Sequence, residues 1–239
     1  MPDSDHHFGM QRCVEPEWLD ELSPTDPRAA RSRLDLQRVN AWMGSAGFMA
    51  RLLRARCGGT PVLRIIDLGA GDGTFALHLA RRLAPLWPGV EITLLDRQRL
   101  ISTAVVDAYA DLGWKAFTAQ MDVLDWLKRE AQDQSDLVIA NLFLHHFDDK
   151  TLQEILRCIA SRTSFFLSCD PRRNSLARLG AWLLWTIGCN AVTRHDAVIS
   201  VAAGFAGQEL SSLWPKEAKW NLREMKAGLF SHCLFAERV

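Results

Sequence analysis

Apolar and polar residues follow one another along this chain in a rhythm that predicts alternating strands and helices. Short apolar runs predict strands, and the segments between them repeat apolar residues every three or four positions, as on one face of a helix. The expected strands cover residues 62–68, 91–96, 114–119, 136–140 and 165–169. Apolar strands that alternate with helices are typical of a parallel sheet covered on both faces.

The end of the chain departs from this rhythm. Residues 220–226 and 230–238 read as two strands joined only by Ala227, Gly228 and Leu229. A connection this short requires an antiparallel hairpin. The sequence therefore predicts an α/β protein with a doubly wound, mostly parallel seven-stranded sheet that ends in an antiparallel hairpin.

Two helical segments flank this pattern. Residues 27–56 read as two helices with a break at 44–47, and residues 171–215 are helical and rich in tryptophan and glycine. We expect a helical N-terminal cap over residues 1–60 and an α/β domain over 61–239, which includes a lid-like insertion at about 171–215. A further short helix is expected near 123–132.

Charge and composition narrow the class of protein. Lys+Arg and Asp+Glu both number 28, and a neutral chain argues against a nucleic-acid partner. The most apolar run, residues 176–192, is interrupted by arginine and glycine and is too short for stable membrane insertion. The N-terminus has no signal pattern, and six scattered cysteines without a Cys-x-x-Cys pair indicate reduced thiols and no metal site. We therefore expect a cytoplasmic protein.

The most informative stretch is the turn that follows the first strand. Gly69, Gly71 and Gly73 permit positive φ and let a ligand approach the bare backbone. The third glycine comes one residue earlier than in the dinucleotide fingerprint, and Asp67 and Asp72 would repel a pyrophosphate. The two carboxylates favour a cationic ligand. The stretch resembles motif I of the class I S-adenosylmethionine-dependent methyltransferases.

This resemblance implies a Rossmann-like methyltransferase fold and S-adenosylmethionine as cofactor. Asp96, at the end of the second strand, would accept the ribose hydroxyls, unless it is a simple turn aspartate. Asp122 would bond the adenine amino group, or cap the following helix, or both. Asn141 would lie against the methionyl end. The expected cofactor-binding set is Asp67, Gly69, Ala70, Gly71, Gly73, Asp96, Arg97, Met121, Asp122, Val123 and Asn141.

Three histidines are candidates for the general base. His145 and His146 follow the fourth strand in a segment similar to motif IV of small-molecule methyltransferases, where the methyl acceptor approaches. An imidazole titrates near neutrality and can remove a hydroxyl proton. His195, in the insertion, is a third candidate, although its segment could equally be a helix start. Arg172 or Arg173 could meet an acidic or phenolate acceptor.

The insertion suggests which acceptor is bound. Its apolar side chains would suit a small hydrophobic aromatic substrate, or else a helix partner or homodimer surface; they are Leu176, Leu179, Trp182, Leu183, Leu184, Trp185 and Ile187. Residues 36–44, 194–197 and 227–232 are similar to the bacterial methyltransferases that accompany type III polyketide synthases. That likeness implies metal-independent O-methylation of a phenol in secondary metabolism, by a monomer or homodimer. A C-methyltransferase of quinone biosynthesis and a non-catalytic S-adenosylmethionine-binding protein are the alternatives.

Overall fold

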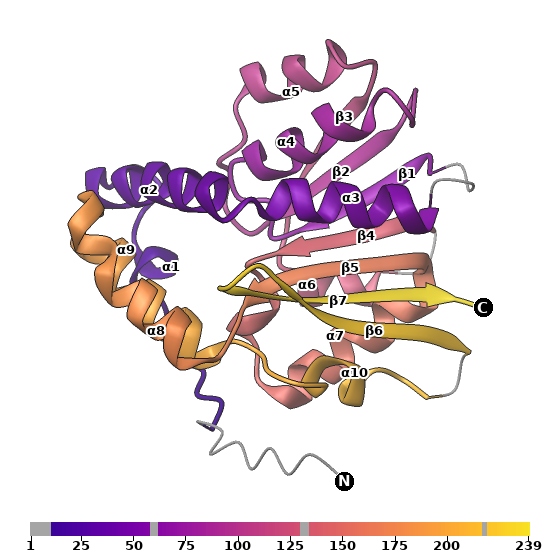
Figure 1. Ribbon diagram of the computed structural model, residues 1–239. Coiled ribbons are helices and arrows are strands. Elements are labelled where there is room, and N and C mark those ends of the chain that lie inside the picture. Colours follow the sequence, from indigo (N-terminus) through magenta and orange to yellow (C-terminus); the bar gives the residue numbers. More distant parts are fainter. Residues whose placement is uncertain (1–10, 58–61, 130–133, 217–218) are drawn as a thin grey trace, which may run out of the picture.

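Seven strands form one sheet in the computed structural model, which describes residues 11–57, 62–129, 134–216 and 219–239. The strand order is β3-β2-β1-β4-β5-β7-β6 (Figure 1). The first five strands pair in parallel, and β7 is antiparallel to both β5 and β6. The strands are β1 Arg64–Leu68, β2 Glu91–Asp96, β3 Lys115–Gln120, β4 Ser135–Asn141, β5 Thr163–Pro171, β6 Trp220–Ala227 and β7 Ser231–Arg238. The predicted fold class is confirmed.

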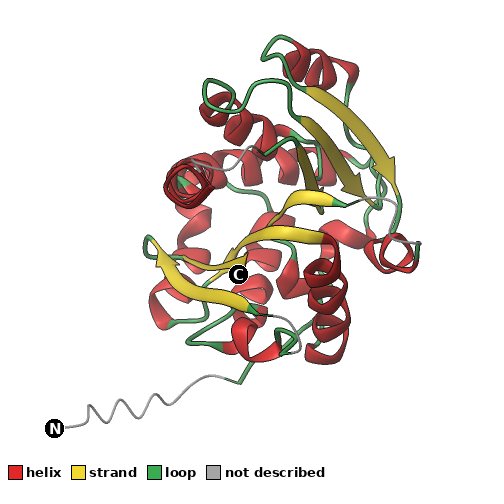
Figure 2. Ribbon diagram, turned by 90° about the vertical axis from the view of Figure 1, so that its right-hand side faces the viewer, coloured by secondary structure: helices red, strands yellow, loops and turns green. Residues whose placement is uncertain are grey.

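Helices cover both faces of this sheet because successive strand residues point to opposite sides (Figure 2). Ile65 belongs to a core formed with α3, α4 and α5, whereas Ile66 belongs to a second core formed with α6, α7 and α10. The helices of these two layers are α3 Ser45–Cys57, α4 Thr74–Leu83, α5 Thr103–Ala110, α6 Val123–Lys128, α7 Asp149–Arg162 and α10 Glu209–Leu213. The predicted helix at 123–132 ends at Lys128, and residues 130–132 lie outside the described residues.

The helix α3 shares the core of the sheet. Met49 and Leu53 are fully buried among the residues that pack on Ile65. A single left-handed glycine, Gly44 with φ of 69°, separates α3 from the helix before it, where the sequence predicted a four-residue break. The helix α3 therefore packs into the same hydrophobic core as β1, and not into a separate N-terminal core. The division of the chain at residue 60 stays a prediction.

A second group of helices lies beyond the carboxyl ends of the parallel strands (Figure 1). These are α1 Trp18–Glu21, α2 Pro27–Met43, α8 Ser175–Trp182, the 3-10 helix η2 Leu183–Ile187 and α9 Ala191–Ala203. Buried polar contacts join α2 to α9: Ser32 Oγ lies 2.9 Å from Thr193 Oγ1, and the Asn190 N–H donates to Asp35 Oδ2 at 2.8 Å. Segments far apart in the sequence thus cover one end of the sheet.

The last part of the predicted lid-like segment packs elsewhere. Leu210 of α10 is fully buried in the core with α7, and Trp214 packs on Phe166 with ring centroids 5.6 Å apart. Within the predicted lid-like segment, only the part from α8 through α9 lies over the carboxyl ends of the strands.

The cysteines are free thiols, and four of the six are buried: Cys57, Cys169, Cys189 and Cys233. Within the described part of the chain, no helix is long and apolar enough to cross a membrane.

Candidate functional site

The glycine loop after β1 forms the floor of the site. Gly69, Gly71 and Gly73 all adopt positive φ, between 58° and 78°, as the sequence predicted. The N–H groups of Gly69 and Ala70 both donate to the carbonyl of Leu95 at 2.9 Å, which turns the chain back over β2. Gly73 then precedes α4, so the first turn of this helix, with the positive end of its dipole, adjoins the loop.

Side chains hold the shape of this loop. Asp96 accepts hydrogen bonds from the Gly71 N–H at 2.8 Å and from the Gln98 N–H at 2.7 Å. Asp72 accepts from the N–H and the hydroxyl of Thr74, at 2.9 and 2.6 Å. Both carboxylates line the cavity described below, where burial raises the pKa of Asp96.

Asp67 does not lie where the sequence placed it. Its side chain is buried within β1 and is not among the residues that line the cavity. Burial, and then the nearby charge of Asp96, raise the pKa of this carboxyl well above its usual range. Burial thus disfavours the charged form of Asp67 that the sequence argument assumed.

One large cavity, of about 1530 Å³, extends from the glycine loop to the helices at the carboxyl ends of the strands. It has room for a cofactor and an acceptor side by side. Apart from Asp67, every predicted cofactor-binding residue but Gly73 lines it: Gly69, Ala70, Gly71, Asp96, Arg97, Met121, Asp122, Val123 and Asn141. Asp122 also caps α6, since its Oδ1 accepts from the Leu124 N–H at 2.8 Å.

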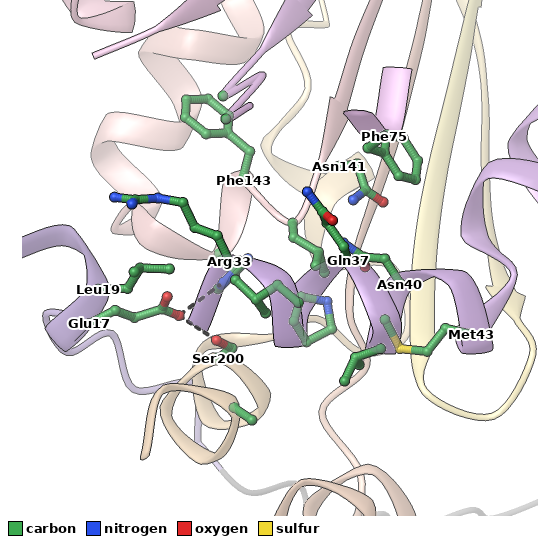
Figure 3. A pocket seen from close by; sticks show the side chains of 18 of the residues that line it. Glu17, Leu19, Arg33, Gln37, Asn40, Met43, Phe75, Asn141, Phe143 and Ser200 are labelled. Atoms are coloured by element: carbon green, nitrogen blue, oxygen red, sulfur yellow. Dashed lines mark hydrogen bonds and ion pairs between the residues drawn. The ribbon is translucent and has the colours of Figure 1, made fainter. Parts of the chain in front are cut away.

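Among the described residues that line this cavity, two have an amide oxygen without a hydrogen-bond partner. Asn141 Oδ1 and Asn40 Oδ1 are both buried and unpaired, and both residues line the cavity (Figure 3). A buried acceptor without a partner is costly unless a ligand supplies a donor. Gly71 borders open space, because a Cβ added there would meet no atom within 4 Å. These features fit a polar ligand at the loop.

His145 lies in a network of buried carboxylates. It belongs to the 3-10 helix η1, Leu144–His146, which follows β4. Its Nδ1 is 3.0 Å from Asp170 Oδ1 and its Nε2 is 3.3 Å from Glu17 Oε1. Burial opposes protonation of this ring, but the hydrogen bonds to Asp170 and Glu17 outweigh it and raise the pKa of His145 to about 9. His145 is therefore an imidazolium at neutral pH.

Glu17 completes this network from the N-terminal segment. It also accepts a hydrogen bond from the Ser200 hydroxyl of α9 (Figure 3). Burial opposes ionisation, but the hydrogen bond and charge of His145 outweigh it and lower the pKa of Glu17 to about 2. The sequence analysis missed Glu17, because nothing local marks a glutamate 128 residues away from its partner. Asp170 was also missed, although its place near the end of β5 could have indicated it.

His146 has a different environment. Its ring also lines the cavity, with Nδ1 3.6 Å from Asp20 Oδ2. Burial and the neighbouring positive charge of His145 lower the pKa of His146, so this ring is neutral at neutral pH. A neutral imidazole that faces the cavity can accept a proton.

His195 lies away from the cavity. Its ring stacks on Trp18 with centroids 3.6 Å apart, and its Nδ1 lies 2.8 Å from Asp196 Oδ1. Arg172 and Arg173 do not line the cavity either, and Arg173 pairs with Glu209. The geometry thus brings together two of the three predicted histidines and gives no support to His195.

The structure also assembles a set of atoms that could ligate a metal. Ligand atoms of Glu17, His145 and His146 all lie within 4.8 Å of one another. The sequence analysis did not anticipate this grouping, and metal-independent transfer stays a prediction. Both ring nitrogens of His145 already contact carboxylates, an arrangement that equally suits proton transfer.

The comparisons with known proteins agree with this geometry. Residues 65–163 match the family described as a methyltransferase domain. This match covers less than half of the chain, and over these residues the chain is similar to methyltransferases. The methyltransferase domain carries the glycine loop, the ends of β2, β3 and β4, and both histidines of η1. The predicted class and cofactor are thereby confirmed for this domain.

Individual relatives resemble parts of the chain. The trans-aconitate 2-methyltransferase of Mycobacterium tuberculosis is 38% identical over 93 residues, which make up 39% of this chain and 31% of that protein. An O-methyltransferase family protein from Burkholderia thailandensis is 18% identical, with a TM-score of 0.59 over 90% of this chain and 60% of that one. Human N-acetylserotonin methyltransferase in complex with S-adenosylmethionine gives 16% identity, a TM-score of 0.50, and coverage of 92% and 61%. At such identities the structural likenesses show the fold alone. The chain therefore matches only about a third of the length of the trans-aconitate 2-methyltransferase.

Proposed function

We propose that this protein transfers a methyl group from S-adenosylmethionine to the hydroxyl of a small hydrophobic, phenolic acceptor, without a metal. The observation that carries the proposal is the single continuous cavity, which joins the glycine loop, the neutral ring of His146 and the apolar side chains of the α8–η2 segment. A donor and an acceptor bound at its two ends would meet beside η1.

The glycine-loop end fits the cofactor. Asp96 offers carboxylate oxygens for ribose hydroxyls, Met121 and Val123 offer apolar surface beside Asp122 for the adenine, and Asn141 offers its unpaired oxygen for the ammonium group. When bound, S-adenosylmethionine supplies an electrophilic methyl carbon on a positively charged sulfur. The protein's remaining task is to align the acceptor oxygen and to exclude water.

His146 is the general base in this proposal. Asp20 faces its Nδ1, so the opposite ring nitrogen, Nε2, would take the proton from the acceptor hydroxyl. The oxygen then forms a bond to the methyl carbon as the carbon–sulfur bond breaks. His145, whose two ring nitrogens contact Asp170 and Glu17, would hold η1 in place beside the acceptor.

The acceptor end is apolar. Leu176, Leu179, Leu183, Leu184 and Ile187 line it. Trp182 and Trp185, which the sequence grouped with them, do not line it. This lining supports an alkylated aromatic acceptor of the kind expected for a methyltransferase that accompanies a type III polyketide synthase.

Three measurements test the proposal. Calorimetry should detect S-adenosylmethionine binding below millimolar concentration, and absence of binding would refute it. Incubation with alkylated phenols should then give a new methoxy group by mass spectrometry and NMR. A methyl group on ring carbon would instead indicate a C-methyltransferase, and binding without any product would indicate a non-catalytic protein. Turnover that disappears after dialysis against EDTA and returns with a divalent metal would contradict the metal-independent mechanism.

A further inference from the structure

Large apolar side chains are exposed on the outer face of the segment from α8 to η2. Trp182 is 63% exposed and Trp185 is 55% exposed. Trp182 also borders a groove between α8 and α9, together with Leu179, Arg178 and Val198. Isolated exposed apolar residues are common in monomeric proteins, but tryptophans and leucines grouped on one short segment mark an interaction surface.

This apolar face is continuous with the mouth of the cavity. Leu176, Leu179 and Ile187 line the cavity and yet are about half exposed, so they lie where it opens to solvent. Trp42, at the end of α2, borders the same cavity. It lines the cavity, is 75% exposed, and stacks on Phe230 with ring centroids 5.5 Å apart.

Positive charge surrounds this face. The helix α2 and residues 174–203 together carry six arginines and two aspartates, and both aspartates, Asp35 and Asp196, are buried. Arg31 and Arg38 are more than half exposed and share the one carboxylate of Asp35. Arg38 also donates to the carbonyl of Ile187 at 3.3 Å, which places its guanidinium beside the apolar face.

We propose that this face, formed by α8, η2 and the end of α2, docks on an anionic lipid surface. Tryptophans partition to the boundary between headgroups and acyl chains, and arginines beside them pair with lipid phosphates. Such docking needs no helix that spans the membrane. The proposal goes beyond methyl transfer, because the surface would bind lipid whether or not the cavity holds a cofactor. An acceptor dissolved in the lipid would enter the cavity at its apolar mouth.

Vesicle sedimentation tests the proposal with the full chain. We expect the protein to sediment with vesicles of phosphatidylglycerol and phosphatidylcholine, to release at high salt, and to stay in solution with pure phosphatidylcholine. The double variant Trp182→Ser and Trp185→Ser should weaken binding at least tenfold. Its matched control is Leu63→Ser with Leu86→Ser. These two residues are each 53% exposed and lie outside α2, α8 and η2.

A second pair of variants tests the charge. Arg178→Glu with Arg194→Glu should weaken binding to the anionic vesicles by roughly fivefold per residue changed. Arg54→Glu with Arg56→Glu, at the far end of α3, makes the same charge change and should leave binding nearly unaltered. Equal binding by the tryptophan variant and its control would overturn the proposal. The proposal would also be overturned if the wild-type protein were a dimer and the tryptophan variant a monomer. A second copy of the chain, and not a lipid surface, would then cover this face.

Discussion

Two neighbouring histidines carry different charges because different groups surround their rings. His145 is enclosed by two carboxylates, Asp170 and Glu17, which hold its proton. His146 lies farther from its carboxylates, with Asp20 Oδ2 at 3.6 Å and a Glu17 oxygen within 4.8 Å, and it lies beside a ring that is already positive. The rings are 4.3 Å apart between centroids, and protonation of one therefore disfavours protonation of the other. Sequence could locate the pair but could not assign an acid and a base to it.

The first prediction follows from that difference. His146→Ala should lower kcat about 10²–10³-fold, because the acceptor proton loses its base. It should change the affinity for S-adenosylmethionine little. His195→Ala should stay within about twofold of wild type, since its ring is stacked on Trp18 outside the cavity. Steady-state kinetics on the same acceptor distinguish the two variants. An equal loss of kcat in both would mean that His146 is not the general base.

A second prediction concerns the stability of the buried Glu17–His145 pair. The native pKa of His145, about 9, lies above its ordinary value of 6.5, so its contribution is complete below pH 6.5 and is lost as pH rises through 9. The native pKa of Glu17, about 2, lies below its ordinary value of 4.5, so its contribution is complete above pH 4.5 and is lost as pH falls toward 2. The pair should stabilise the fold most between about pH 4.5 and 6.5.

Urea unfolding across pH tests this prediction. From pH 6.5 to 9.5 the free energy of unfolding of wild type should fall by on the order of 1–3 kcal/mol through this pair. Glu17→Gln keeps a hydrogen-bonding side chain beside Ser200 but removes the charge, so its curve should be flatter over the same range. Parallel curves for wild type and Glu17→Gln would show that the ion pair does not contribute.

At the scale of elements, the loop after β1 and the loop after β4 fit against each other. A Cβ added at Gly69 would lie 2.2 Å from the Phe143 ring, so β1 can end beside η1 only if this residue is glycine. Leu142, just before Phe143, adopts a positive φ of 52°, which a leucine rarely does. The two loops thus hold each other in the conformations that form the cavity floor.

Gly69→Ala tests this contact. Its matched control is Gly113→Ala, because Gly113 has a similar φ of 74° but open space where its Cβ would lie. Both variants strain the backbone, and only Gly69→Ala forces Phe143 to move. We expect Gly69→Ala to cost about 1–3 kcal/mol more in stability than Gly113→Ala and to weaken S-adenosylmethionine binding. Thermal unfolding and calorimetry measure the two effects. Equal stability of the two variants would mean that Phe143 moves aside without cost.

At the scale of the molecule, local patterns predicted the sheet well and the acceptor side poorly. The apolar runs located β1–β7, and the rule that ligands bind at carboxyl ends of strands brought Asp96, Asp122 and Asn141 to one cavity. The burial of Asp67 could not be predicted, because it depends on the covering of β1 by both layers. Glu17 and α1 were missed, since a four-residue helix has no period to detect and its contacts come from α9 and η1. The exposure of Trp182 likewise depends on how α8 packs on α9.

The whole molecule should respond to its cofactor as one cooperative unit. At about 100 times its dissociation constant, a ligand that binds only the folded state stabilises it by ~2.7 kcal/mol, which corresponds to a rise in Tm of about 5–10 °C for a chain of this size. Asp96→Asn should reduce this rise by at least half at the same ligand concentration, because the ribose would lose a carboxylate. Asp136→Asn is the matched control: Asp136 also accepts two backbone N–H bonds, from Leu63 and Arg64, but at the opposite end of β1. Its rise in Tm should equal that of wild type even if its own Tm is lower. Differential scanning calorimetry with S-adenosylhomocysteine measures all three proteins, and an undiminished rise in Asp96→Asn would remove Asp96 from the cofactor site.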